Sequence, residues 1–288
     1  MALAALLLLL SITTATFGKY IHRYHRKSFS NSVKSLVTAN KLLREKIDFD
    51  VSSSDDSTFV ILAFGQSNSA NSSNFLYESH NTIINYYKGN TFIAKEPLLG
   101  MKGGLGGSVW TIFADKLIDN RMCRNVVVIP IGISGTNINC WSSGRCNTDL
   151  VETLGLLRQK NIKATHIFWH QGEADNSRIS KGNYKDRLVS IINTVREFGQ
   201  DAPFYCSIAS YAPKRSALTG LGIDANIQQA QIETINEMPN VLAGPNTDKL
   251  IYAIDRFDGQ HFSEIGLDRY SDLLMQSVID GAEEIQQD

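Results

Sequence analysis

The stretch FVILAFGQSN, residues Phe59 to Asn68, decides the fold that the sequence predicts. An apolar run from Phe59 to Phe64, rich in β-branched and aromatic residues and bounded by Gly65, is typical of a buried strand. Serine is a poor nucleophile until a rigid turn after a strand exposes its hydroxyl and a base lies beside it. The stretch therefore predicts a strand that presents Ser67 for reaction.

A candidate base for Ser67 lies near the C-terminus. In the segment DGQH, Asp258 precedes His261 by three residues, so its carboxylate can fold back and accept from the imidazole. The other ring nitrogen of His261 would then face Ser67, as in a serine hydrolase triad. Alone, this spacing is weak, and Ser67 alone could simply cap a following helix. Together, the two segments favour the triad Ser67, Asp258 and His261.

Two further apolar runs end in residues that suit acyl transfer. VVVIPIGISGTN at 126–137 ends in small residues, and THIFWHQGEAD at 165–175 continues into Gln171. Small residues let backbone N–H groups approach a substrate, and acyl transfer needs donors aimed at the developing oxyanion. We expect the oxyanion hole to consist of the backbone N–H groups of Ser67 and Gly135 and the side-chain amide of Gln171.

Apolar strands alternate with helical patterns along this part of the chain. Such alternation predicts an α/β protein, a three-layer α/β/α sandwich with a central parallel sheet that binds ligands at the carboxyl ends of its strands. The expected strands are Phe59–Phe64, Val126–Ile131, Thr165–Trp169, Phe204–Ile208 and Leu250–Ile254, and the expected helices are Ser108–Arg121, Tyr184–Phe198, Ala225–Glu237 and Glu264–Ile279.

Five ordered blocks give the chain a resemblance to a known family. They are GQSN at 65–68, GLGGSVW at 104–110, SGT at 134–136, WHQGEAD at 169–175 and DGQH at 258–261. In this order they resemble the SGNH hydrolase superfamily, specifically its sialate O-acetylesterase-like, carbohydrate acetylesterase branch, over about Thr58 to Gln276. The resemblance implies the flavodoxin-like SGNH hydrolase fold. It also implies the same triad and oxyanion hole; Gln171 stands where many members of the wider superfamily carry asparagine, which indicates the narrower branch.

The expected function is that of a serine esterase that removes O-acetyl groups from carbohydrates, as sialate and xylan O-acetylesterases do, through an acyl-serine intermediate. No cofactor is expected. A lipid esterase or lysophospholipase is one alternative, which the polar loops 69–74 and 142–147 disfavour because an acyl chain needs an apolar groove. A catalytically silent, membrane-tethered carbohydrate-binding module is the other.

Several other side chains could contribute to the site. Trp141 lies in a polar loop and is a candidate sugar-stacking platform, although large aromatics are more often core residues. Glu173 is expected to brace the turn through backbone N–H groups. With His170 and Asp175 it offers metal ligands close in sequence, but no partner cluster is evident and no metal site is expected. Arg145, Lys214 or Arg215 could hold the carboxylate of an acidic sugar.

Composition predicts a single catalytic domain behind a targeting segment. The chain has 288 residues, 43% of them hydrophobic, which is ample for one core. Its formal net charge of −1 gives no reason to expect a nucleic-acid partner. We expect a signal peptide or membrane anchor at 1–18, a basic, weakly helical stalk (with a helical stretch near Val37–Ile47) and polar linker at 19–57, and the esterase domain at 58–288.

The N-terminal segment leaves two interpretations open. The apolar run 1–17 is near the lower length limit for a membrane span, whereas a signal peptide should begin with a basic region that this chain lacks. The protein is therefore expected to be exported or membrane-anchored. Cys140 and Cys146 bracket a short loop and could form a disulfide, which favours export, while Cys123 and Cys206 are expected to be buried thiols. Three full pairings of four cysteines remain open.

Overall fold

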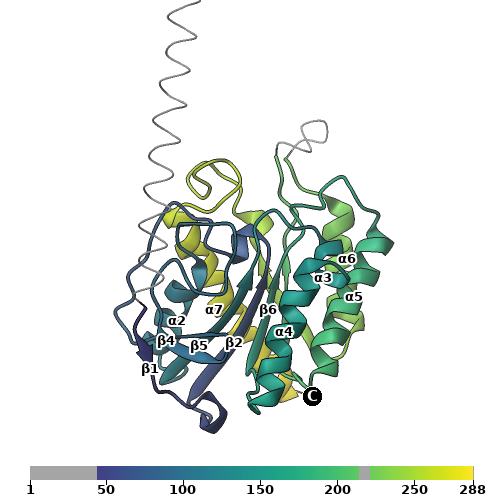
Figure 1. Ribbon diagram of the computed structural model, residues 1–288. Coiled ribbons are helices and arrows are strands. Elements are labelled where there is room, and N and C mark those ends of the chain that lie inside the picture. The colour runs from purple at the N-terminus through teal and green to yellow at the C-terminus, as the bar shows by residue number, and fades with distance from the viewer. Residues whose placement is uncertain (1–43, 214–220, 288) are drawn as a thin grey trace, which may run out of the picture. The chain divides into compact units, whose positions relative to one another are not determined.

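The computed structural model describes residues 44–213 and 221–287 (Figure 1). The compact unit that holds the motif-bearing strand ends starts at Glu45 and runs to Asp288. The expected targeting segment, most of the stalk, Lys214 and Arg215 lie outside the described residues. Within those residues, every helix is too short or too polar to cross a membrane.

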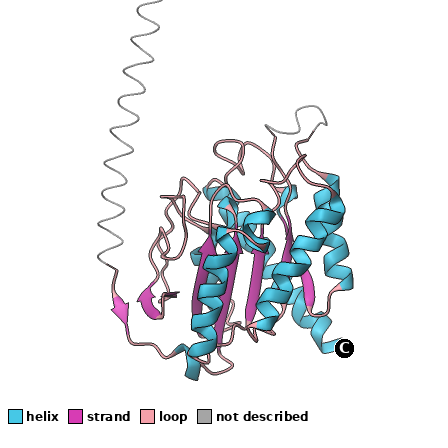
Figure 2. Cartoon of the chain, turned by 45° about the vertical axis from the view of Figure 1, so that its right-hand side comes forward, coloured by secondary structure: helices cyan, strands magenta, loops and turns pink. Residues whose placement is uncertain are grey.

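A single mixed sheet forms the centre of the unit (Figure 2), in the order β1-β4-β3-β5-β2-β6-β7-β8. Neighbouring strands from β3 to β8 pair in parallel, while β4 is antiparallel to both β3 and β1. The strands are β1 Lys46–Ile47, β2 Thr58–Gly65, β3 Ile84–Tyr87, β4 Asn90–Ile93, β5 Asn125–Gly132, β6 His166–His170, β7 Phe204–Ile208 and β8 Val241–Asn246.

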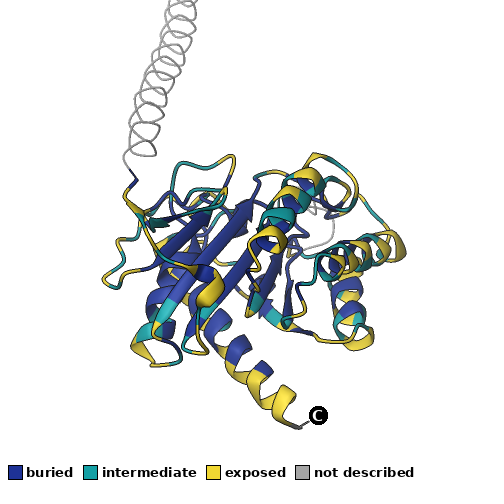
Figure 3. Ribbon diagram, turned by 60° about the horizontal axis from the view of Figure 1, so that its bottom comes forward, coloured by how far each residue is buried: buried dark blue, intermediate teal, exposed yellow. Residues whose placement is uncertain are grey.

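Helices cover both faces of the sheet, because the central strands bury both of their faces. On β2, Leu62 and Phe64 point into one apolar cluster, and Ile61 and Ala63 point into the other. The first cluster packs under α3 Ile138–Ser142, α4 Arg145–Gln159, α5 Lys181–Glu197 and α6 Ala225–Glu237, and the second packs under α2 Val109–Asp119 and α7 Glu264–Gln287. In Figure 3 the sheet is buried and the outer helix faces are exposed. The predicted three-layer α/β/α sandwich is confirmed.

The last strand lies earlier in the chain than predicted. Residues 250–254 form no strand, and the strand that pairs with β7 is β8, Val241–Asn246. This strand contains Gly244 and Pro245, which weaken a strand pattern in the sequence. An edge strand tolerates proline because one row of its backbone groups has no neighbour, and β8 is the edge of the sheet.

The compact unit also begins earlier than the predicted domain boundary at Thr58. Lys46 and Ile47, expected to end a helical stretch, form β1 and pair with β4. Val51 is buried in the core, and the carboxylates of Asp50 and Asp55 bind N–H groups two residues on, which fixes the serine-rich run in turns. Residues 45–57 are therefore part of the domain rather than a linker.

Candidate active site

The end of β2 carries Ser67 into a tight turn. Gly65 has φ +143°, and a Cβ there would lie 2.0 Å from the carbonyl oxygen of His170, so glycine permits the ends of β2 and β6 to approach. The Gln66 N–H donates to the same His170 carbonyl at 3.0 Å. Ser67 then begins a single 3₁₀ turn, closed by the Ala70 N–H at 2.9 Å from the Ser67 carbonyl, so it does not cap an α-helix.

Side chains on both sides hold this turn in place. The Gln66 side-chain carbonyl accepts from the backbone N–H groups of Gly172 at 3.4 Å and Ala174 at 3.0 Å. On the other side, the Trp110 indole N–H donates to the Ser69 carbonyl at 2.8 Å. Buried bonds of this kind fix the backbone from which the Ser67 hydroxyl projects.

Ser67 and His261 line the same open cleft, which has a volume of about 380 Å³. The cleft lies at the carboxyl ends of the parallel strands, where a sheet of this class binds ligands. Its walls are mostly small or polar: Ser67, Asn71, Ser72, Ser73, Gly103, Gly104, Leu105, Gly106, Ser134, Gly135, Gln260 and His261. The predicted nucleophile, the predicted base and one predicted oxyanion residue, Gly135, are thus brought together.

Asp258 orients His261 through two contacts. Its Oδ2 lies 2.7 Å from His261 Nδ1, and its Oδ1 accepts from the His261 backbone N–H, also at 2.7 Å. Oδ1 also accepts from the Gln260 N–H at 2.9 Å, which is the third bond to this carboxylate. Because Nδ1 faces Asp258, Nε2 is the ring nitrogen available to the cleft.

The carboxyl group of Asp258 is held in its charged form. Burial raises the pKa of Asp258, but hydrogen bonds from the His261 N–H, its imidazole and the Gln260 N–H outweigh this effect and bring the net pKa below its usual value. An anionic partner stabilises the imidazolium that forms when His261 takes a proton. Among the described residues, Ser67 Oγ has no hydrogen bond to His261, and such contacts often tighten only with substrate bound.

Two backbone donors are available for an oxyanion. Neither the Ser67 N–H nor the Gly135 N–H has an acceptor among the described residues. Gly135 adopts φ +71°, directly after Ser134, whose own N–H is bonded to the Lys102 carbonyl at 2.9 Å. Unpaired N–H groups beside a nucleophile suit the charge that develops on a carbonyl oxygen during acyl transfer.

Gln171 is not among the residues that line the cleft. Its Nε2 lies 2.5 Å from Asp175 Oδ2 and 3.2 Å from Gln66 Oε1, and its Oε1 accepts from the Tyr184 hydroxyl at 3.1 Å. The side chain is fully buried. Gln171 Nε2 also lies 3.3 Å from the carbonyl oxygen of Thr136, the residue after Gly135, and the predicted role of Gln171 in the oxyanion hole stays a prediction.

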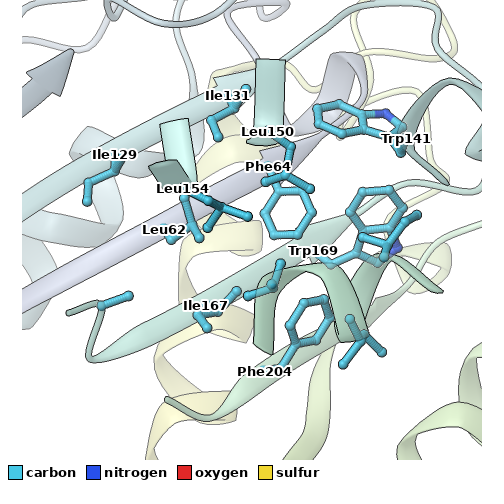
Figure 4. Packing of buried hydrophobic residues seen from close by; sticks show 14 of the residues in the cluster. Leu62, Phe64, Ile129, Ile131, Trp141, Leu150, Leu154, Ile167, Trp169 and Phe204 are labelled. Atoms are coloured by element: carbon cyan, nitrogen blue, oxygen red, sulfur yellow. The ribbon is translucent and has the colours of Figure 1, made fainter. Parts of the chain in front are cut away.

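The prediction of Trp141 as a sugar platform is wrong. Its indole is fully buried, with ring centroids 5.8 Å from Phe64 and 5.6 Å from Trp169, and its N–H donates to Thr136 Oγ1 at 3.0 Å. Figure 4 shows the three rings packed together. Cys140 and Cys146, which flank this residue in the sequence, form a disulfide. A polar loop in the sequence therefore holds a core side chain.

An aromatic residue that sequence reasoning missed lies beside the base. Phe257 is 44% exposed, and its ring is stacked near that of His261, with centroids 6.2 Å apart. The Phe257 N–H donates to the His261 carbonyl at 3.0 Å, which holds the two residues side by side. The only sequence signal was its position just before the DGQH block.

The Glu173 carboxylate contacts a side chain of the serine turn and a side chain of β6. Its Oε1 accepts from Asn68 Nδ2 at 2.8 Å and lies 3.1 Å from His170 Nε2. The carboxylate is buried, as is the imidazole. Within the described ranges 44–213 and 221–287, no three His, Cys, Asp or Glu side chains converge as metal ligands.

Comparisons with known proteins show the family of this chain. Residues 57–263 match a family described as carbohydrate esterase, sialic acid-specific acetylesterase. The chain belongs to this family. Membership makes it an ester hydrolase of the carbohydrate esterase class, and the recognised motifs all fall within the matched residues. No curated protein sequence is significantly similar to the chain.

Solved structures support the fold. A protein from Arabidopsis thaliana is similar over 78% of this chain and 99% of its own, with a TM-score of 0.61 and 17% identity. The structure of NanS covers 80% of this chain and 99% of its own, with a TM-score of 0.53 and 15% identity. A GDSL-like lipase from Parabacteroides merdae covers 81% of this chain and 98% of its own, with a TM-score of 0.51 and 13% identity.

Proposed function

We propose that this chain removes O-acetyl groups from carbohydrates through an acetyl-serine intermediate on Ser67. The observation that carries the proposal is the cleft that Ser67 shares with His261, which Asp258 orients. The N–H groups of Ser67 and Gly135 at this cleft have no acceptor within the described part of the chain. Membership of a carbohydrate esterase family supports the same substrate class.

The reaction follows from these positions. Ser67 Oγ attacks the acetyl carbonyl carbon while His261 Nε2 takes the hydroxyl proton, and the oxyanion forms against the two N–H groups. The bond to the sugar oxygen then breaks, and the sugar leaves as an alcohol with the proton from His261. Water attacks the acetyl-serine with His261 again as base, which releases acetate and restores Ser67.

The cleft favours a small acyl group over a fatty acyl chain. An acyl chain needs an extended apolar groove, whereas the described residues around Ser67 are mainly serine, asparagine and glycine, and Leu105 is their one large apolar side chain. Hydroxyl and amide groups suit the polar edges of a sugar. This lining supports a carbohydrate ester over the lipid ester alternative.

We also propose that the protein is exported or membrane-anchored by its N-terminal segment. The Cys140–Cys146 disulfide supports passage through an oxidising compartment, where such bonds form and persist. Fractionation of cells that express the full chain, with sequencing of the mature N-terminus, separates a cleaved signal peptide from a retained anchor. Recovery of the intact chain in the cytosol with both cysteines reduced would contradict export.

The substrate proposal is tested by acetate release. The panel contains an acetylated xylo-oligosaccharide, an O-acetylated sialic acid and p-nitrophenyl esters of acetate, butanoate and octanoate. We expect turnover of at least one acetylated sugar and a steep fall in kcat/KM from acetate to octanoate. Preference for octanoate would support the lipid esterase, and sugar binding without turnover of any ester would support a silent binding module.

A further inference from the structure

We propose that Asn68 clamps the nucleophile turn, Ser67–Ser69, to the base loop, residues 250–263. The buried carboxylate of Glu173 holds this clamp in place. The proposal rests on the proposed function, because it concerns Ser67 and His261 as a reacting pair. Asn68 directly follows Ser67, and Gln260 directly precedes His261. A bond between Asn68 and Gln260 therefore joins the neighbours of nucleophile and base.

The Asn68 amide makes that bond. Its Nδ2 donates to Glu173 Oε1 at 2.8 Å and to the Gln260 carbonyl oxygen at 3.3 Å. Both partners are acceptors, so the amide nitrogen, with its two hydrogens, must face them. The side chain is buried, and the contact with Gln260 spans 192 residues of sequence. One amide thus connects two loops that lie far apart in the sequence.

Glu173 is a fixed anion behind the clamp. Burial raises the pKa of Glu173, but the charge of His170 and hydrogen bonds from His170 and Asn68 outweigh this and lower it to about 2. The carboxylate is therefore charged at neutral pH, and hydrogen bonds to a charged acceptor are shorter and stronger than neutral ones. A bond of this kind, to Glu173 Oε1, holds the Asn68 amide in place.

The network continues to the helix that follows the base loop. His170 Nδ1 lies 2.8 Å from the Tyr270 hydroxyl on α7, and His170 Nε2 faces Glu173. With a proton on Nε2, the imidazole donates to the Glu173 carboxylate, while Nδ1 pairs with the Tyr270 hydroxyl. Glu173 is thus linked to both sides of His261. Asn68 connects it to Gln260, before the base, and His170 connects it to Tyr270 on α7, after the base.

Arg256 fixes the same Gln260 carbonyl from within the base loop. Its Nη1 donates to that oxygen, and its Nε donates to the Leu250 carbonyl at 2.6 Å. The guanidinium is buried against the Phe262 ring, 4.3 Å from the centroid, and it interacts electrostatically with Glu173. A buried cation thereby offsets the buried anion, and the Gln260 carbonyl receives a bond from each loop.

This arrangement positions His261 without a direct bond to Ser67. A displacement of about 1 Å between reacting groups costs on the order of 100-fold in rate, so a clamp that sets their separation acts mainly on kcat. A purely structural amide would instead change stability and leave kcat in the folded protein unaltered. Asn68 and Glu173 are positioning residues by this account.

The full-length chain with Asn68→Ala tests the proposal against Asn85→Ala. Asn85 is an equally buried asparagine that binds the backbone N–H and carbonyl of Leu99, away from the cleft lining. Both variants lose a buried amide, and both are assayed well below their unfolding temperatures with p-nitrophenyl acetate. A fluorophosphonate probe measures the reactivity of Ser67 separately from turnover.

We expect Asn68→Ala to lower kcat and the labelling rate by about 100-fold with KM within about threefold, while Asn85→Ala keeps kcat within about twofold. Should Asn68→Ala not fold, Glu173→Gln, which keeps an oxygen acceptor, is expected to lower kcat by about 10-fold. A folded Asn68→Ala or Glu173→Gln with kcat within threefold of wild type would overturn the clamp, as would an equal loss in Asn85→Ala. Labelling of wild-type Ser67 without release of acetate would instead overturn the proposed substrate, and the labelling rates of the variants would still decide the clamp.

Discussion

Both carboxylate oxygens of Asp258 bind His261, one at the imidazole Nδ1 and one at the backbone N–H, each at 2.7 Å. A single side chain therefore fixes the ring orientation and the backbone that carries the ring. The charge on Asp258 also favours the imidazolium formed during catalysis.

The substitution Asp258→Asn removes the charge of this side chain and keeps its shape. The amide keeps an oxygen for the backbone bond but places an N–H group at Nδ1, which favours the wrong tautomer of His261. We expect kcat on p-nitrophenyl acetate to fall by roughly 10²- to 10⁴-fold with little change in KM. A kcat within threefold of wild type would exclude Asp258 from the triad.

Phe257 is expected to contribute to sugar binding, because its exposed ring lies beside His261. Aromatic faces pack on the apolar faces of sugars. We expect Phe257→Ala to raise KM for an acetylated oligosaccharide by about fivefold and to change KM for p-nitrophenyl acetate by less than twofold. Tyr252, which is 68% exposed on the same loop, supplies the control. Equal effects of Tyr252→Ala and Phe257→Ala would argue against a specific contact.

Glu173 predicts loss of stability in acid. Its pKa of about 2 lies below the ordinary value of 4.5, so its contribution is fully present above about pH 4.5 and is lost as pH falls towards 2. That contribution is on the order of 3 kcal/mol. Urea unfolding of wild type and Glu173→Gln at several pH values measures it. The two curves should diverge from pH 2 to 5, and parallel curves would show that Glu173 is not a stabilised anion.

For Glu96 we expect the opposite effect, a free energy of unfolding that falls as pH rises. Burial raises the pKa of Glu96 to about 7, although hydrogen bonds from Ser108, Thr111 and the Leu98 N–H oppose this. Its stabilising contribution is therefore complete below about pH 4.5 and is lost as pH rises through 7, by on the order of 3 kcal/mol. Glu96→Gln should flatten the fall in unfolding free energy between pH 5 and 8. An unchanged slope would mean that Glu96 does not take up a proton on folding.

The sequence predicted the structure best for elements whose burial appears directly as a local pattern of apolar residues. The strands around Ser67, Gly135 and Gln171 are buried on both faces and therefore form continuous apolar runs, which predicted the parallel sheet. Helix α6 was predicted with the bounds observed, Ala225–Glu237. The Asp258–His261 contact is local, so its spacing, taken together with the Ser67 segment, was enough to predict it.

Features that depend on distant contacts were not predictable from local pattern. Trp141 lies among polar residues but is buried by Phe64 and Trp169, which belong to other elements. The strand β8 contains glycine and proline and is recognised only by its pairing with β7. The contact between Asn68 and Gln260 joins residues 192 positions apart, and no spacing rule encodes it.

The central claim is that Ser67 and His261 hydrolyse an acetyl ester of a carbohydrate. Its most direct test is acetate release from an acetylated xylo-oligosaccharide and an O-acetylated sialic acid by the wild-type chain, Ser67→Ala and His261→Ala. The account predicts turnover of at least one sugar by wild type and a loss of about 10³-fold or more in both variants. Turnover by Ser67→Ala at the wild-type rate, or a folded wild type inert on both sugars, would contradict it.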